Sequence, residues 1–184
     1  MLFGIIAIAV VVLIVLWGFG AYNGLVRGRT SAEEAFSTMD VYLKKRFDLI
    51  PNLVETVKGY AKHESETLEK VIAARNAVAA APSDAARVEG ENMISGALRQ
   101  LFALSESYPD LKANTNFQQL QDQLKKVEDD IANSRKYYNA VVREYNIKVQ
   151  SIPTNIVANI GGFKTKPLYE VEDAAQRNNV QVKF

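Results

Sequence analysis

An uncharged apolar run at residues 2–21 constrains this chain more than any other feature of its sequence. As a helix that rises ~1.5 Å per residue, the run extends about 30 Å, the thickness of the hydrocarbon core of a bilayer. We therefore predict a transmembrane anchor over residues 1–24. The side chains expected to contact lipid or the headgroup layer are Ile5, Val12, Leu16, Trp17 and Tyr22. The alternative is a cleaved secretory signal, but no Lys or Arg precedes the run to form the basic start of such a signal.

Basic residues follow the apolar run, at Arg27 and Arg29. The cytoplasmic ends of membrane-spanning helices carry an excess of Lys and Arg. We therefore predict a single-pass membrane protein whose remaining residues lie in the cytoplasm. The absence of Cys excludes a disulfide framework and fits a reducing compartment.

The composition argues against catalysis and against nucleic-acid binding. The formal net charge is +1, so the chain has no strongly basic field that would attract nucleic acid. One His and no Cys exclude the usual zinc sites, and no P-loop, GxGxxG or GxSxG motif is present. His63 beside Glu64 is the one place where an acid–base pair could be imagined, and a surface His is the simpler interpretation. We predict a protein that is not an enzyme, with no catalytic residue, no metal site and no cofactor.

Apolar residues recur every three or four positions from residue 30 to 81, which predicts a long amphipathic helix. Thr30 or Ser31 can cap its start. Pro51 lies in the middle of this segment and predicts a kink or a split near Ile50, because proline removes a backbone hydrogen bond and crowds the preceding turn.

A second helix is expected from residue 83 to residue 108. Ser83 is a good N-cap, and Pro109 opposes continuation of the helix. Within it, Gly90 and Gly96 either weaken the helix or permit the close approach of a neighbour.

The last long helix has the cleanest pattern, a heptad repeat of large side chains. The heptad positions are Phe117, Leu124, Ile131, Tyr138 and Tyr145. A sustained heptad predicts a packing seam between helices. Tyr138-Asn139 and Tyr145-Asn146 would place ring hydroxyls in this seam, with an Asn beside each as a hydrogen-bond partner.

Long helices with short connections pack antiparallel to their neighbours in sequence. The predicted fold class is therefore all-α, with an N-terminal transmembrane helix followed by an up-and-down antiparallel bundle over residues 25–163. The bundle has four helices if Pro51 breaks the first segment and three long ones if Pro51 only bends it. Residues 152–163 are expected to form a helical turn or two that closes the bundle, and residues 164–184 a loosely ordered C-terminal tail.

Two further patterns have both a structural and a functional interpretation. Gly20, Gly24 and Gly28 follow the four-residue spacing that permits close helix approach, or they loosen the junction between anchor and bundle. The basic cluster at residues 44–46 is expected to be a solvated face, unless the domain tilts far enough to bring it to anionic lipid.

The segments RFDLIPNLV, GYAKHE and YPDLKAN, followed by YYNAVVREYN and IPTNIVANIGGF, closely resemble the LemA family of bacterial membrane proteins. The resemblance covers nearly the whole chain and implies a single N-terminal spanning helix with a helical bundle. It implies no established enzymatic activity, and some relatives take part in building intracellular membrane compartments. The motif residues expected to have a structural or assembly role are Asp48, Pro51, Asn52, Gly59, Tyr60, His63, Glu64, Tyr138, Asn139, Tyr145 and Asn146.

These observations predict a non-enzymatic, membrane-anchored scaffold or interaction protein that assembles with copies of itself in the bacterial cell membrane. Its expected partners are the lipid bilayer and further copies of the chain, and no nucleic acid. Another membrane protein is the further partner considered, because the alternative function is an adaptor or regulator of a membrane enzyme such as a protease, in which the anchor raises the local concentration of a docking surface.

Overall fold

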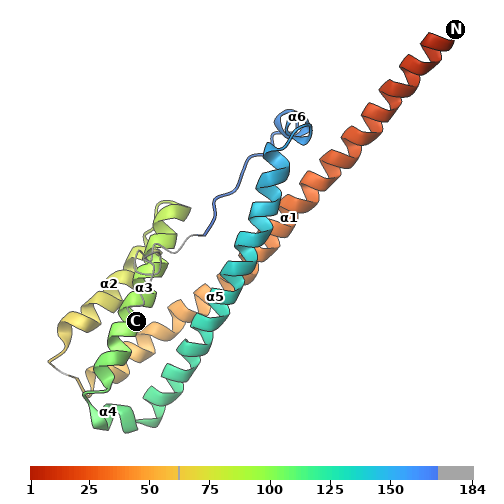
Figure 1. Ribbon diagram of the computed structural model, residues 1–184. Coiled ribbons are helices and arrows are strands. Elements are labelled where there is room, and N and C mark those ends of the chain that lie inside the picture. Colours follow the sequence, from red (N-terminus) through yellow and green to blue (C-terminus); the bar gives the residue numbers. More distant parts are fainter. Residues whose placement is uncertain (62, 170–184) are drawn as a thin grey trace, which may run out of the picture. The chain divides into compact units, whose positions relative to one another are not determined.

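A computed structural model describes residues 1–61 and 63–169, and every regular element in that part of the chain is an α-helix (Figure 1). The helices are α1 (Leu2–Lys58), α2 (Ser65–Ala79), α3 (Asp84–Ser105), α4 (Pro109–Ala113), α5 (Thr115–Gln150) and α6 (Thr154–Ile160). The predicted all-α class, with an apolar N-terminal helix and a helical bundle, is confirmed.

The chain divides into two compact units. The first unit contains Met1–Asp40 and Ala132–Leu168, and the second contains Val41–Ile131 with Tyr169. The long helices α1 and α5 each contribute to both units.

In the first unit, α1 and α5 pack side by side in opposite directions. The rings of Phe36 and Tyr138 meet edge to face with centroids 5.8 Å apart. Closer to the N-terminus of α1, Gly28 faces Tyr145 of α5, and a Cβ at Gly28 would lie 3.1 Å from the Tyr145 ring. The small size of Gly28 therefore serves a contact within the chain, whereas Gly20 and Gly24 face open space.

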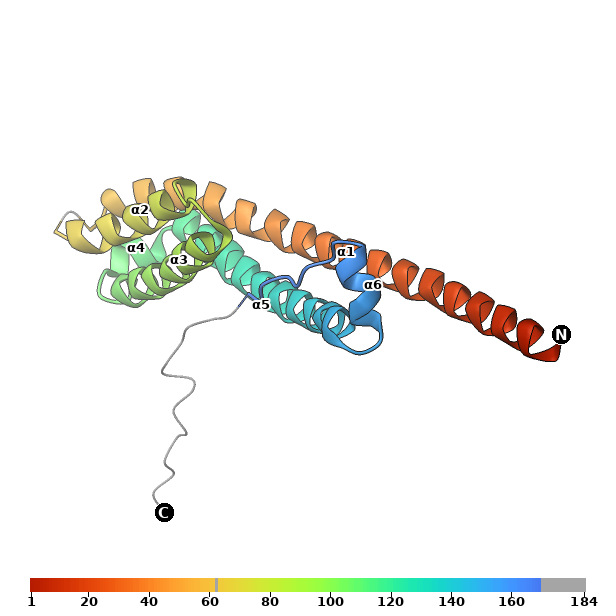
Figure 2. The ribbon, with the colours of Figure 1, turned by 90° about the horizontal axis from the view of Figure 1, so that it is seen from above.

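In the second unit, α2 and α3 form an antiparallel hairpin, which Figure 2 shows side by side. The side chain of Ser83 accepts a hydrogen bond from the backbone N–H of Ala86 at 3.2 Å, so the predicted N-cap of α3 is confirmed. Gly90 of α3 lies against Val78 of α2, and a Cβ at Gly90 would come within 2.8 Å of it. The core of this unit is drawn from the helices α1, α2, α3, α4 and α5.

Of the two outcomes predicted at Pro51, a kink or a split, the split does not occur. Helix α1 continues through Pro51, whose ring is exposed, and ends at Lys58 before Gly59. Proline removes one hydrogen bond from a helix, and here its ring displaces no core side chain, so the helix survives it. Thr30 and Ser31 do not cap a helix either, because they lie inside α1.

The heptad of the last long helix is confirmed, since all five heptad side chains of α5 are buried. Four of the described helices are at least 15 residues long, namely α1, α2, α3 and α5. The four-helix alternative required a break at Pro51, which does not occur; the four main helices arise because the first segment ends at Lys58 and α2 begins at Ser65. The predicted tail lies outside the described residues from residue 170 onward, and residues 164–167 are held against α5 by hydrogen bonds.

Candidate interaction site

The N-terminal part of α1 leaves its apolar side chains uncovered. Within the described residues, α1 is the helix long and apolar enough to cross a membrane. Its most apolar 18-residue window has a mean hydropathy of 3.0, and none of that window is buried. The five predicted anchor residues are all exposed: Ile5, Val12, Leu16, Trp17 and Tyr22. Insertion into a lipid bilayer would remove this apolar surface from water.

A buried ionic cluster lies inside the second unit, around Arg46. Its guanidinium donates hydrogen bonds to the carboxylate of Glu91 and, at 3.0 Å, to the backbone carbonyl of that residue. It also donates to Glu128 Oε1 at 2.5 Å and to Ser95 Oγ at 2.6 Å. Ser95 in turn donates to the other oxygen of Glu128 at 2.8 Å. The cluster therefore joins α1, α3 and α5.

The electrostatics of this cluster keep Arg46 charged. Burial by itself would lower the pKa of the guanidinium, but the carboxylates of Glu128 and Glu91 outweigh burial and raise that pKa. Arg46 is completely buried and Glu91 nearly so, whereas 30% of the Glu128 side chain is exposed, so the guanidinium itself serves to join the three helices.

Arg46 corrects the prediction that residues 44–46 form a solvated face. Lys44 and Lys45 are exposed, whereas Arg46 lies in the core. The signal was present in the sequence, because Arg46 falls on the stripe of buried residues that includes Met39, Leu43 and Ile50.

The GYAKHE and YPDLKAN motifs meet in the second unit. The side-chain amide of Asn114 donates to the hydroxyl of Tyr60 at 2.8 Å. Tyr108 donates its hydroxyl proton to Glu64 at 2.8 Å, and this hydrogen bond to a carboxylate raises the pKa of Tyr108. His63 is exposed. The carboxylate of Glu64 is thus hydrogen-bonded to Tyr108. The described residues show no hydrogen bond between His63 and Glu64, which an acid–base couple would need.

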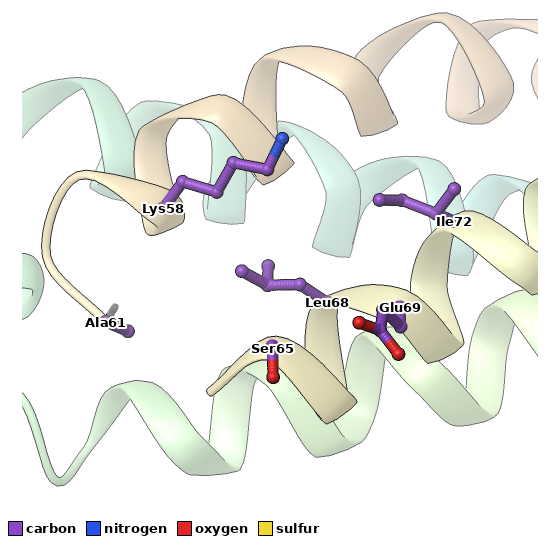
Figure 3. A pocket seen from close by; sticks show the side chains of 6 residues that line it. All are labelled: Lys58, Ala61, Ser65, Leu68, Glu69 and Ile72. Atoms are coloured by element: carbon purple, nitrogen blue, oxygen red, sulfur yellow. The ribbon is translucent and has the colours of Figure 1, made fainter. Parts of the chain in front are cut away.

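A small groove lies beside the GYAKHE motif, between the end of α1 and the start of α2 (Figure 3). Its volume is about 280 Å³. The apolar lining comes from Ala61, Leu68 and Ile72, and the polar lining from Lys58, Ser65 and Glu69. Pockets for small molecules usually measure about 300–1,000 Å³, so this groove is at their lower limit.

The other motif residues lie apart from this groove. On α1, Asp48, Pro51 and Asn52 are exposed, and Asp48 pairs with Lys44 at 3.1 Å. Gly59 is the first residue after α1.

The tyrosine–asparagine pairs belong to the first unit, where their contacts differ from the prediction. Tyr138 donates to the carbonyl of Pro167 at 3.0 Å, and Tyr145 donates to the carbonyl of Lys164 at 3.0 Å. Asn146 exchanges two hydrogen bonds with the backbone of Lys166.

The ring hydroxyls therefore bond to the chain after α6 and not to the adjacent Asn. Burial raises the pKa of Tyr145, which keeps its hydroxyl available as a donor. Asn139 is half-buried. The motif thus fastens residues 164–167 to α5, which is a packing role.

No group of three or more His, Cys, Asp or Glu side chains within residues 1–61 and 63–169 is placed to hold a metal ion. The Arg46 cluster contains two carboxylates, and both bind the guanidinium.

Comparison with known proteins gives a family and three relatives. The model described as the LemA family matches residues 35–184. The chain is 27% identical to Protein LemA of Metamycoplasma hominis over 168 residues, which covers 87% of this chain and 77% of that protein. It is 26% identical to Magnetosome protein MamQ 2 of Paramagnetospirillum magneticum over 179 residues, covering 83% of this chain and 66% of the relative. Magnetosome protein MamQ of Magnetospirillum gryphiswaldense is 24% identical over 169 residues, with 78% and 62% covered. None of these names is that of an enzyme.

Proposed function

Since this chain belongs to the LemA family, we propose that it is a membrane-anchored interaction protein that assembles with copies of itself at the bilayer and catalyses no reaction. Family membership and the apolar N-terminal helix make it a membrane-associated bacterial protein. Self-assembly, and a cytoplasmic position of the bundle, are the further steps that we propose.

The observation that carries the proposal is the continuity of α1. The uncovered apolar part and the packed part belong to one helix, and Leu25 is its first buried residue. The apolar part and the part of α1 that packs against α5 in the first unit are continuous within Met1–Asp40, so no flexible linker separates the anchor from that α1–α5 pair. Surfaces on that pair are held at the membrane, where confinement raises the effective concentration of other copies.

The heptad seam of α5 is not the surface for assembly, because its side chains are buried within one chain. Outward residues remain available on the same helix. In the first unit, Tyr137 and Ile147 of α5 are large, apolar and more than half exposed. Tyrosine is among the residues that contribute most to protein interfaces. We therefore place the contact between copies on the outward face of α5.

Cysteine cross-linking in membranes tests this assignment, because the chain contains no native Cys. Tyr137→Cys, treated with a short thiol cross-linker, is expected to give covalent dimers. Val142→Cys, a buried position on the same helix, is the matched control and should give none. Light scattering of the detergent-purified wild type should report a multiple of the monomer mass.

Two results would contradict self-assembly. The first is a strictly monomeric mass at micromolar concentration together with no dimer from Tyr137→Cys. The second is reproducible cross-linking to a different membrane protein, such as a protease, without self-links, which would establish the adaptor alternative.

A further inference from the structure

Three isoleucines in and directly before α6 are unusually exposed. The exposed fractions are 83% for Ile152, 57% for Ile156 and 85% for Ile160. Four-residue spacing puts Ile156 and Ile160 on one face of α6. The other side of α6 packs inward, because Ala158 is fully buried and contributes to the core of the unit. One face of α6 is therefore apolar and exposed to solvent.

Helix α6 lies beside α1 at the end of the apolar run, as both ribbon views show (Figures 1 and 2). The ring of Phe163, just after α6, meets the ring of Tyr22 edge to face with centroids 5.3 Å apart. A Cβ added at Gly161 would lie 3.2 Å from the same tyrosine ring. With the proposed anchor in the bilayer, Tyr22 would lie at the headgroup layer, and these contacts would hold α6 at the same depth.

Basic side chains predominate in the chain segments next to the apolar run and around α6, and Glu33, the first acidic residue after the apolar run, pairs with Lys166 at 3.2 Å. Residues 1–32 and 145–169 contain no Asp or Glu. The same two stretches carry four exposed cationic side chains, namely Arg27, Arg29, Lys148 and Lys164. Anionic headgroups attract such cations within a Debye length of about 8 Å at physiological ionic strength.

We propose that α6 and Ile152 are a second membrane contact, inserted into the interfacial layer of the bilayer that holds the N-terminal part of α1. Ile152, Ile156 and Ile160 lie against acyl chains, and the four cations lie among anionic headgroups. A single spanning helix leaves the first unit free to rotate about the helix axis, and this second contact fixes the side that faces the membrane. The inference rests on the proposed anchor.

Fluorescence in vesicles tests this second contact with the full chain. An environment-sensitive dye is attached to Ile156→Cys, and the protein is reconstituted into vesicles of phosphatidylcholine and phosphatidylglycerol. The matched control carries the dye on Asn133→Cys, an exposed polar position of α5 in the same unit. At Ile156 we expect blue-shifted emission, several-fold weaker quenching by aqueous iodide, and strong quenching by nitroxide-labelled lipid.

Equal iodide quenching at positions 156 and 133 would overturn the inference. Protection from iodide without quenching by nitroxide lipid would also overturn it, because another protein surface would then cover α6. A dye on Ile8→Cys reports the anchor itself. Lipid quenching at position 8 but not at position 156 rejects the α6 contact alone, and loss at both positions rejects the anchor as well.

A second variant tests the apolar face directly. With the dye on Ile152→Cys, the double change Ile156→Ser and Ile160→Ser should raise iodide quenching to the level of the Asn133 control. Both replaced side chains are mostly exposed, so the melting temperature in detergent should not change. Unchanged protection at position 152 would contradict the assignment of this face to lipid.

Discussion

Arg46 and Glu91 form an ion pair in the interior of the second unit, with 0% and 2% of their side chains exposed. The pair connects α1 to α3, and the same guanidinium reaches Glu128 on α5. A buried charge is tolerated when it is paired and hydrogen-bonded. Only a few relative positions of the helices allow both side chains to form these hydrogen bonds. We therefore regard the cluster as a device that fixes how the three helices align.

Replacing Arg46 by Met should lower the free energy of unfolding by about 3–5 kcal/mol, because it leaves Glu91 buried without its partner. Urea unfolding of the detergent-purified chain measures the change. Lys45→Met, at the exposed neighbouring position, is the control and should shift the value by no more than about 0.5 kcal/mol.

The double variant Arg46→Met with Glu91→Leu should recover much of that loss, since no unpaired charge then remains at position 91. A double variant as unstable as Arg46→Met alone would show that packing, and not the unpaired carboxylate, causes the loss.

The two glycines of α3 should respond to alanine in opposite directions. A Cβ at Gly90 would come within 2.8 Å of a Val78 side-chain carbon and 3.1 Å of its backbone nitrogen, so Gly90→Ala forces α2 and α3 apart and should cost about 1–3 kcal/mol. Gly96 faces open space, and Gly96→Ala should stabilise the helix by up to about 1 kcal/mol. Melting temperatures of the two variants check the signs. A stabilising Gly90→Ala would contradict the close approach.

Features that depend on local periodicity could be predicted from the sequence. The heptad from Phe117 to Tyr145 was predicted because burial recurs with the helix repeat, and so was the N-cap at Ser83, which needs only a side chain three residues before its donor. Arg46 was missed because a binary pattern counts every Arg as polar. Its position on the buried stripe was the signal that could have revealed it.

Features that depend on distant partners could not be predicted in this way. Helix α1 ends at Lys58, and soon after it the hydrogen bonds Tyr60–Asn114 and Glu64–Tyr108 join residues 44 or more positions apart. The acceptor for Tyr145 is likewise the carbonyl of Lys164 beyond α6, which no spacing rule indicates. Sequence adjacency alone suggests Asn146 as the partner of the Tyr145 hydroxyl, because it contains no information on where residues 151–167 fold.

Core truncation on α5 tests the heptad energetically. Leu124→Ala and Ile131→Ala should each cost about 2–5 kcal/mol, through lost burial and the cavity left behind. Since a domain is stable by roughly 5–15 kcal/mol, the double variant approaches unfolding. Lys125→Ala, at an exposed position of the same helix, is the control. Near-wild-type melting of the double variant would mean that these positions are not core.

Pro51→Ala should raise the free energy of unfolding. The proline is exposed within a continuous helix, and proline costs about 3 kcal/mol relative to alanine in a helix interior, which sets the upper limit of the gain. Chemical unfolding measures it, with Asn52→Ala as the neighbouring exposed control. Destabilisation by Pro51→Ala would show that the proline ring or its bend makes a necessary contact.

The position of the bundle relative to the membrane decides which partners it can meet. Arg27 and Arg29 directly follow the apolar run, and the positive-inside bias places such residues in the cytoplasm. Asp122 is an exposed residue of α5, and the chain has no native Cys, so Asp122→Cys gives an unambiguous labelling site. In intact cells this thiol should resist a membrane-impermeant maleimide, and it should react once the inner membrane is opened.

The control for access is a cysteine on a protein of known periplasmic location, labelled in the same cells after only the outer barrier is opened. If Asp122→Cys reacts together with that control, the bundle faces away from the cytoplasm and the predicted orientation is wrong. The surface of α6 would then meet the outer leaflet of the same membrane. Its contact with Tyr22 at the end of the apolar run would be unchanged, because that contact is within the first unit and does not depend on the side of the membrane.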